Sequence, residues 1–177
     1  IACNTAIAQE GMHGDYGANI GKVIAIRKDL PSLLKAYAAA GSDARMNGCE
    51  LPVVINSGSG NQGLTVSVPL IIYAEREHLD KEKLYRALVI SNLTAIHLKT
   101  EIGRLSAFCG AVSAGAACGA GLAYLKDASE EVMNHTIVNA LAITSGIICD
   151  GAKASCAAKI AVSVEAVSYT HLTLPTI

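Results

Sequence analysis

The stretch from Leu105 to Leu125 constrains the fold most strongly, because it contains no charged residue and consists mostly of Ala and Gly. A helix that is apolar all round must be buried, either in a protein core or in a bilayer. The stretch is long enough to span a bilayer, and Gly115 and Gly119 have the small-xxx-small spacing of packed membrane helices. Ala and Gly contribute little transfer free energy, however. We therefore expect a buried helix over about 107–125 in a mainly α domain, and membrane insertion is the less favoured alternative.

Periodicity and capping residues predict helices along the rest of the chain. The expected helices cover residues 1–10, ended by Gly11; a segment from Pro31, interrupted near Gly41; 81 to about 100, after an Asp80 cap; 130–145, after a Ser129 cap; and 152–166. A glycine-rich loop is expected over 11–21. At most one short extended segment is expected, near 51–56. The fold class is thus an Ala/Gly-rich helical domain.

The charge balance argues against nucleic acid as a partner. The net charge is -1, no dense Lys/Arg cluster is present, and one Phe with no Trp gives no platform for stacking bases. Six cysteines lie in Ala/Gly-rich helical stretches rather than in the loops of a disulfide scaffold. We therefore expect reduced thiols, a cytoplasmic location and a small-molecule partner. The sequence leaves open whether the chain forms a homo-oligomer.

A glycine loop lies between the extended segment and the next apolar run. Gly58, Gly60 and Gly63 have the spacing G-x-G-x-x-G that dinucleotide-binding folds use for pyrophosphate. The following residues predict another helix instead of the second strand that such a fold requires, so a nucleotide site is a weak alternative. Glycines and a helix N-terminus also suit a carboxylate, and short polar side chains suit an amino group. The alternatives are therefore an amino-acid site and a structural turn, formed by Ser57, Gly58, Ser59, Gly60, Asn61, Gln62 and Gly63.

Three cysteines occupy glycine-rich junctions: Cys109, Cys149 and Cys156. Cys149 and Cys156 are seven residues apart, and seven residues of helix rise about 10 Å, too far for two ligands of one small cluster. We therefore expect Cys149 in a turn and Cys156 one to two turns into the last helix. No C-x-x-C pair or nearby His supports zinc. Three thiolates on a four-iron cluster would leave one iron open for Lewis-acid chemistry. Inert buried cysteines remain the alternative, and Cys118 is expected to be a core residue.

Several segments together resemble the L-cysteine desulfidase and serine dehydratase alpha-chain family, in particular its UPF0597 branch. They are SGSGNQG at 57–63, SAFCGAVSAG at 106–115, CDGAKASCAAK at 149–159, SDARMNG at 42–48 and MHGDYGANIG at 12–21. The resemblance covers residues 1–166. It implies a partial domain of this family whose N-terminal half, and with it a further cysteine motif, is missing, so that this chain alone is expected to be inactive.

The resemblance also implies a chemistry. The implied enzyme is a lyase with a 4Fe-4S cluster on Cys109, Cys149 and Cys156, and with the loop 57–63 binding the substrate. The reaction would be β-elimination of L-cysteine to pyruvate, ammonia and hydrogen sulfide, or of L-serine to pyruvate and ammonia. It involves no pyridoxal phosphate. Asp150 and Lys153 are weak catalytic candidates, with a helix cap and a solvated lysine as their alternatives. A non-enzymatic helical membrane or scaffold protein is the alternative function.

The last eleven residues, 167–177, differ in composition from the alanine-rich segment before them. VSYTHLTLPT at 167–176 resembles one reading frame of a transposase sequencing adapter. We expect a non-native, poorly ordered tail, and we exclude His171 from every site; a natural helix-breaking terminus is the alternative.

Overall fold

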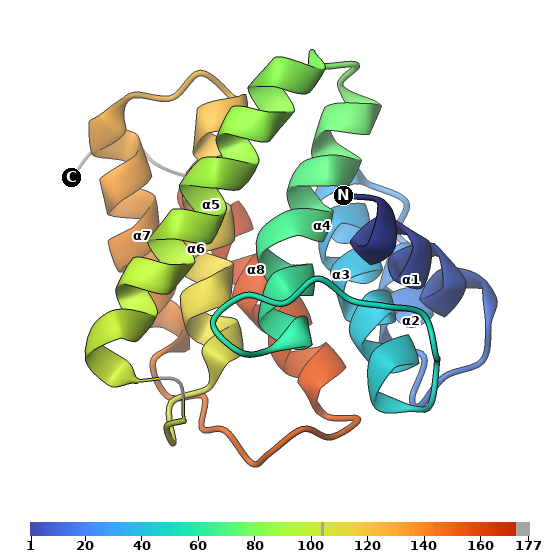
Figure 1. The fold of residues 1–177 in the computed structure, drawn as a ribbon. Helices are drawn as coiled ribbons and strands as arrows, with labels where there is room; N and C mark the ends of the chain where they lie inside the picture. The colour runs from blue at the N-terminus through green and yellow to red at the C-terminus, as the bar shows by residue number, and fades with distance from the viewer. Residues whose placement is uncertain (104, 173–177) are drawn as a thin grey trace.

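The computed structural model describes residues 1–103 and 105–172, with side chains described as far as residue 168. This part of the chain contains eight helices and no strand (Figure 1). The helices are α1 (Ala2–His13), α2 (Ile20–Ala25), α3 (Leu30–Met46), α4 (Gly60–Arg76), α5 (Lys81–Ile102), α6 (Gly110–Leu125), α7 (Glu130–Thr144) and α8 (Cys156–Leu172). The prediction of a mainly α-helical domain is confirmed.

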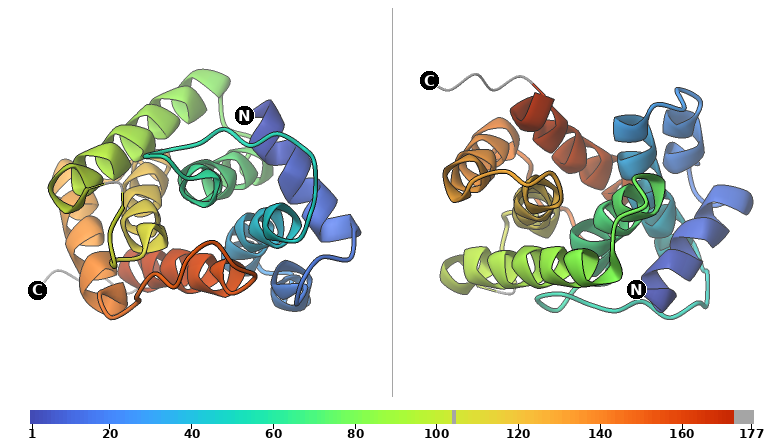
Figure 2. Two further views of the ribbon diagram at one scale, coloured as in Figure 1. Left: turned by 60° about the horizontal axis from the view of Figure 1, so that its bottom comes forward. Right: turned by 90° about the horizontal axis from the view of Figure 1, so that it is seen from above.

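The helices form a bundle around two centres. α6 packs against α4, α5, α7 and α8, whereas α3 packs against α1, α2, α4 and α8 (Figure 2). α4 and α8 contact both central helices and therefore join the two halves. The starts of α4, α6 and α8 all lie near the lower edge of the bundle in Figure 1.

The predicted burial of the uncharged stretch is confirmed in α6. Nearly every residue of this helix is buried, and its small side chains allow neighbouring helices to approach closely. A Cβ on Gly115 would lie 2.6 Å from Cβ of Ser163 in α8, and one on Gly121 would lie 2.5 Å from Cδ2 of Leu70 in α4. Within the described residues, no helix combines the length and the apolar character that crossing a membrane requires.

Two of the predicted helix starts are confirmed by capping hydrogen bonds. The Asp80 carboxylate accepts from the backbone N–H of Glu82 at 2.9 Å, and α5 begins at Lys81, directly after Asp80. The Ser129 hydroxyl accepts from the backbone N–H of Val132 at 3.3 Å, at the start of α7. Each cap satisfies an N–H group that has no partner within its helix.

Two glycines that were expected to end or interrupt helices lie inside them. Gly11 is within α1 and Gly41 within α3. A Cβ on Gly11 would approach the carbonyl oxygen of Ala40 to 2.0 Å, and one on Gly41 would lie 3.1 Å from Cδ2 of Leu64. The prediction was wrong because these glycines serve close helix packing, which offsets their low helix propensity.

The segment before α4 is extended, as predicted, and does not join a sheet. An isolated bridge pairs Asn56 with Ser59. The Asn4 side chain takes the place of a neighbouring strand: its oxygen accepts from the N–H of Val54 at 2.8 Å, and its amide donates to the Val54 carbonyl at 3.3 Å. Because these backbone groups are satisfied in this way, the segment lies fixed over the first turn of α4.

The last helix differs from the prediction at both ends. α8 begins at Cys156 instead of residue 152 and continues to Leu172, past the expected end at Ala166. Val167 is only 1% exposed and packs close to Gly119. The expected poor order of the tail stays a prediction. Residues 173–177 lie outside the described residues, and the non-native origin of 167–177 stays a prediction.

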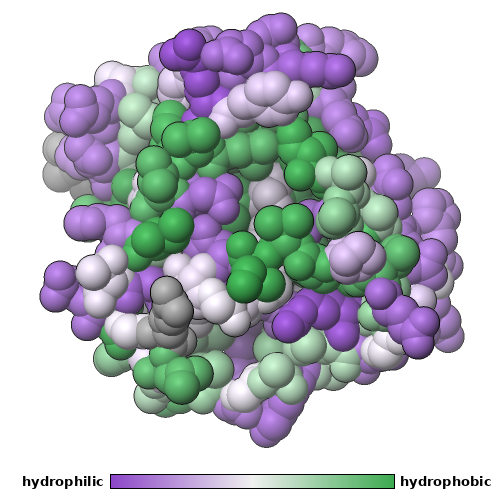
Figure 3. Space-filling view, in the orientation of Figure 1, coloured by the Kyte–Doolittle hydropathy of each residue, from purple (hydrophilic) through white to green (hydrophobic). Residues whose placement is uncertain are grey.

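An apolar stripe runs along the outer face of α5. It consists of Tyr85, Val89, Leu93 and Ile96, each about half or more exposed. These positions recur every three to four residues and therefore share one side of the helix. Figure 3 shows apolar side chains gathered over the centre of this face. We call these four residues the α5 stripe.

Candidate functional site

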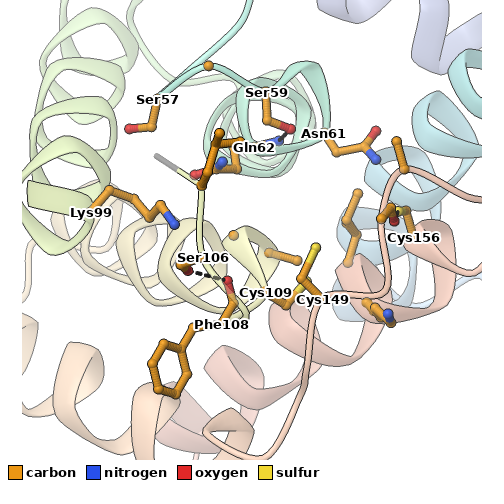
Figure 4. Close-up of a pocket in the computed structure, with 18 of the residues that line it drawn as sticks. Ser57, Ser59, Asn61, Gln62, Lys99, Ser106, Phe108, Cys109, Cys149 and Cys156 are labelled. Carbon is orange, nitrogen blue, oxygen red and sulfur yellow. Dashed lines mark hydrogen bonds between the residues drawn. The ribbon is translucent and has the colours of Figure 1, made fainter. Parts of the chain in front are cut away.

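The N-terminal ends of three helices surround one cleft of about 330 Å³. α4, α6 and α8 begin here, and the loops that precede them supply most of the lining (Figure 4). Helix N-termini carry partial positive charge and N–H groups without intrahelical partners. A cleft formed by three of them is suited to anionic groups.

The three cysteines that the sequence singled out all line this cleft (Figure 4). Cys109 is the N-cap residue of α6, Cys149 lies in the loop after α7, and Cys156 is the first residue of α8. Cys149 therefore occupies a turn, as predicted. Cys156 does not lie one to two turns into its helix, because α8 begins later than the sequence pattern indicated.

A short backbone pairing brings the first two cysteines together. Phe108 and Ile148 form an isolated antiparallel bridge. The N–H of Cys149 donates to the Ala107 carbonyl at 2.8 Å, and the N–H of Cys109 donates to the Ile147 carbonyl at 3.3 Å. Residues that are 40 apart in sequence are thus held next to each other at the mouth of the cleft.

Burial and neighbouring groups shape the protonation of Cys109. Burial raises the pKa of this thiol, and the nearby sulfurs of Cys149 and Cys156 raise it further. The backbone N–H of Ala111 and the ammonium of Lys159 oppose the rise in pKa. In contrast, Cys118 is fully buried within α6, and burial raises its pKa strongly, as expected of an inert core thiol.

The soft donors that line the cleft are three free thiols. Within residues 1–103 and 105–172, no group of three His, Cys, Asp or Glu side chains could hold one metal ion. A cluster instead presents its ligand positions on separate iron atoms, so its ligands can be spread around a cavity. The three free thiols, the cleft volume and the three helix N-termini fit a negatively charged iron–sulfur cluster.

The glycine loop forms one wall of the cleft, although its residues have different roles. Ser57 and Gly58 both have positive φ, 47° and 83°, so the chain turns sharply before α4. The Ser59 hydroxyl caps α4 by accepting from the N–H of Gln62 at 3.5 Å. A Cβ on Gly60 would lie 2.4 Å from Nε of Arg45, so this glycine makes room for the guanidinium.

The last glycine of the motif is structural. A Cβ on Gly63 would meet the Val54 carbonyl oxygen at 1.9 Å. Gly63 therefore allows the extended segment to cross α4, and it is not among the residues that line the cleft. The nucleotide interpretation of the motif is wrong, because the described residues contain no strand and α4 is followed directly by α5.

Three polar oxygens of the loop are buried without a hydrogen-bond partner among the described residues. They are Oγ of Ser57, Oδ1 of Asn61 and Oε1 of Gln62. The Gln62 side chain lies over Gly110, where a Cβ would come within 2.6 Å of it. An unsatisfied buried acceptor is costly, so these atoms need a donor from a bound water or a ligand.

Cations of the cleft were missed by the sequence analysis. Arg45, Lys99 and Lys159 all line it. A signal for Lys99 was present, since it lies four residues after the buried Ala95 and therefore on the core-facing side of α5. No local pattern pointed to Arg45, which reaches the cleft only because α3 packs against α4.

The two weak catalytic candidates lie outside the lining of the cleft as the described residues define it. The Asp150 carboxylate accepts from Nζ of Lys159, and this contact lowers the pKa of Asp150. Nζ of Lys159 also donates to the Ile148 carbonyl at 3.1 Å, so the pair ties the Cys149 loop to α8. Lys153 is exposed, in agreement with the alternative interpretation that it is a solvated lysine.

Together, the fold and the cleft define a protein whose described residues form a helical bundle with a cleft lined by three thiols. A family model described as "Serine dehydratase alpha chain" matches residues 1–174. The chain belongs to this family, as its motifs predicted.

Curated relatives carry names of the UPF0597 group. A UPF0597 protein of Desulfitobacterium hafniense is 61% identical over 168 residues, which cover 94% of this chain and 39% of the relative. One of Lachnoclostridium phytofermentans is 59% identical, covering 94% and 40%. The UPF0597 protein YhaM of Escherichia coli is 42% identical, covering 92% and 39%. The chain thus spans about two fifths of the length of these relatives, and no solved structure matches it.

Proposed function

We propose that this chain carries the cluster and part of the substrate site of an iron–sulfur amino-acid lyase. The reaction is β-elimination of L-cysteine, or of L-serine, to pyruvate. One observation carries the proposal: three free thiols and a polar loop with unsatisfied acceptors line the same cleft. The family to which the chain belongs supports a link to lyases of this kind.

In this proposal, Cys109, Cys149 and Cys156 hold a 4Fe-4S cluster as thiolates. When bound, the cluster would supply Lewis acidity that stabilises the departing sulfur or oxygen. The N-termini of α4, α6 and α8 favour the thiolates and the added negative charge. Lys159 contributes a further positive charge near Cys109.

The loop before and within α4 binds the substrate. The unsatisfied oxygens of Asn61 and Gln62 accept hydrogen bonds from the substrate ammonium. In the reaction, a base takes the α-proton and the electron pair of that C–H bond forms the double bond between Cα and Cβ. The bond from Cβ to sulfur or oxygen breaks, and its electron pair departs with the leaving group. The resulting aminoacrylate is hydrolysed by water to pyruvate and ammonia. Asp150 is suited to hold the Cys149 loop and not to accept the proton, because its pKa is lowered by Lys159.

Anaerobic purification tests the cluster. We expect the chain to retain iron and acid-labile sulfide, and Cys109→Ser, Cys149→Ser or Cys156→Ser each to lose most of both. Cys3→Ser and Cys49→Ser are the matched controls, because both thiols lie outside the cleft lining. Equal iron loss in the controls or in Cys118→Ser would refute the choice of ligands.

Turnover is tested on a protein of the relatives' full length. The corresponding cysteine changes in the Desulfitobacterium hafniense relative should abolish the release of sulfide and pyruvate from L-cysteine. If iron is retained but no pyruvate is released from cysteine or serine, the proposed cluster stands and the proposed lyase reaction is overturned. A cytoplasmic location stays a prediction.

A further inference from the structure

The lysine in the last turn of α5 is buried and forms no ion pair within residues 1–103 and 105–172. Lys99 is 5% exposed, and its nitrogen points into the cleft, opposite the loop that bears Gln62 (Figure 4). No carboxylate among the described residues forms an ion pair with it, and no hydrogen bond from its ammonium is formed there. Lys99 therefore differs from an ordinary surface lysine on a helix.

A second buried lysine shows how this chain pairs a buried ammonium when the lysine has a structural role. Lys35 in α3 is 9% exposed, and its ammonium pairs with the Glu165 carboxylate of α8. Burying an unpaired ammonium is unfavourable, so natural proteins normally supply a partner of opposite charge. α5 and its neighbours supply no such partner to Lys99 within the described residues, so its ammonium is available to an anionic group of a ligand in the cleft.

The lining of the cleft includes both a lysine without an ion pair among the described residues and polar oxygens without a donor there. The Lys99 ammonium lines the cleft and forms no ion pair within the described residues, whereas Oδ1 of Asn61 and Oε1 of Gln62 are buried acceptors without a donor there. An α-amino acid supplies both missing groups, a carboxylate for the first and an ammonium for the second. A simple anion would satisfy only the lysine and would leave two buried oxygens unpaired.

We infer that Lys99 binds the α-carboxylate of the substrate and thereby restricts the site to amino acids whose carboxylate is free. The inference rests on the proposed function for the identity of the substrate. It adds a residue outside the glycine loop, on a different helix, that sets the orientation of the amino acid. With the carboxylate at Lys99 and the ammonium at Asn61 and Gln62, two points on the substrate are fixed before the reaction begins.

Equilibrium binding with a pair of ligands tests this role. L-Serine has the carboxylate, whereas L-serinamide keeps the ammonium and hydroxyl and replaces the carboxylate by a neutral amide. We expect the unsubstituted chain to bind L-serine more tightly than L-serinamide. Lys99→Met should weaken L-serine binding by about tenfold or more, because a charge-assisted contact is lost, and leave L-serinamide binding unchanged. Lys99→Arg should restore part of the affinity for L-serine, because it keeps the charge.

Lys81→Met is the matched control, since Lys81 is an exposed lysine of the same helix, and it should change neither affinity. Equal weakening for both ligands, unchanged L-serine binding in Lys99→Met, or no L-serine binding by the unsubstituted chain would each overturn the inference. If Lys99→Met does not fold, as judged by circular dichroism, the unsubstituted chain and Lys99→Arg test the inference. Both should then bind L-serine more tightly than L-serinamide. Iron is measured in every sample: loss of iron from all of them counts against the lyase, whereas loss of the ligand preference counts against Lys99.

Discussion

Gly115 is a point of close contact between α6 and α8, and alanine at this position tests the packing that positions two of the three thiols. A Cβ there would lie 2.6 Å from Cβ of Ser163, 2.9 Å from its carbonyl oxygen and 3.0 Å from its carbonyl carbon. Non-bonded carbon atoms prefer about 3.5–4.0 Å, so the backbone of α8 has to move by about 1 Å. Rotation of a side chain cannot relieve contacts with backbone atoms.

The magnitude follows from two opposing effects. Because the contacts include backbone atoms of Ser163, the overpacking cost lies in the upper part of the usual range, about 2–3 kcal/mol, and the higher helix propensity of alanine returns about 1 kcal/mol. We therefore expect Gly115→Ala to lower the free energy of unfolding by about 1–2 kcal/mol. For a chain of this size, the midpoint of thermal unfolding would fall by about 2–8 °C.

Thermal unfolding followed by far-ultraviolet circular dichroism provides the measurement. Gly146→Ala is the control, because a Cβ there meets nothing within 4 Å and its φ is not positive. This control should be neutral or more stable by up to about 1 kcal/mol. A Gly115→Ala chain as stable as the unsubstituted one, beside a well-behaved control, would refute the close contact between α6 and α8.

Three further predictions concern the cleft and the surface. Gly60→Val should displace the Arg45 guanidinium, which lies against this glycine, and weaken L-serine binding without iron loss; loss of both would assign the loop a purely structural role. The pair of Asp150 and Lys159 should stabilise the fold evenly from about pH 5 to 9. Its contribution is lost in acid, as pH falls through the lowered pKa of Asp150, and in alkali, as pH rises through the raised pKa of Lys159. In Asp150→Asn, urea unfolding should lack both losses, and an unchanged profile would exclude the pair. The α5 stripe should bind a hydrophobic dye, and Leu93→Lys should reduce that fluorescence; equal fluorescence would place the dye elsewhere.

Some of this protein could be predicted from local chemistry. An uncharged run of alanine and glycine must be buried, and α6 is buried. Asp80 and Ser129 cap helices because their side chains reach the free N–H groups of the next turn, an interaction within a few residues. Cys118 could be separated from the other cysteines because it lies in the middle of the most apolar helix.

Contacts between distant segments were decided by the tertiary structure alone. Gly11 and Gly41 were interpreted as helix breakers because propensity is local, whereas their close neighbours, Ala40 and Leu64, lie 29 and 23 residues away. The start of α8 at Cys156 was also missed. Local sequence does not show that the preceding loop is held by the pairing of Phe108 with Ile148.

The site shows the same division. Sequence spacing singled out the three cysteines and the polar loop, but it could not show that they face one cleft. That arrangement exists because α4, α6 and α8 start at the same edge of the bundle. Lys99 became visible as a ligand-binding residue only through burial without a counter-ion, and burial depends on every helix packed around it. The sequence by itself therefore determined which residues could perform the chemistry, and the packing of the helices decided which of them meet.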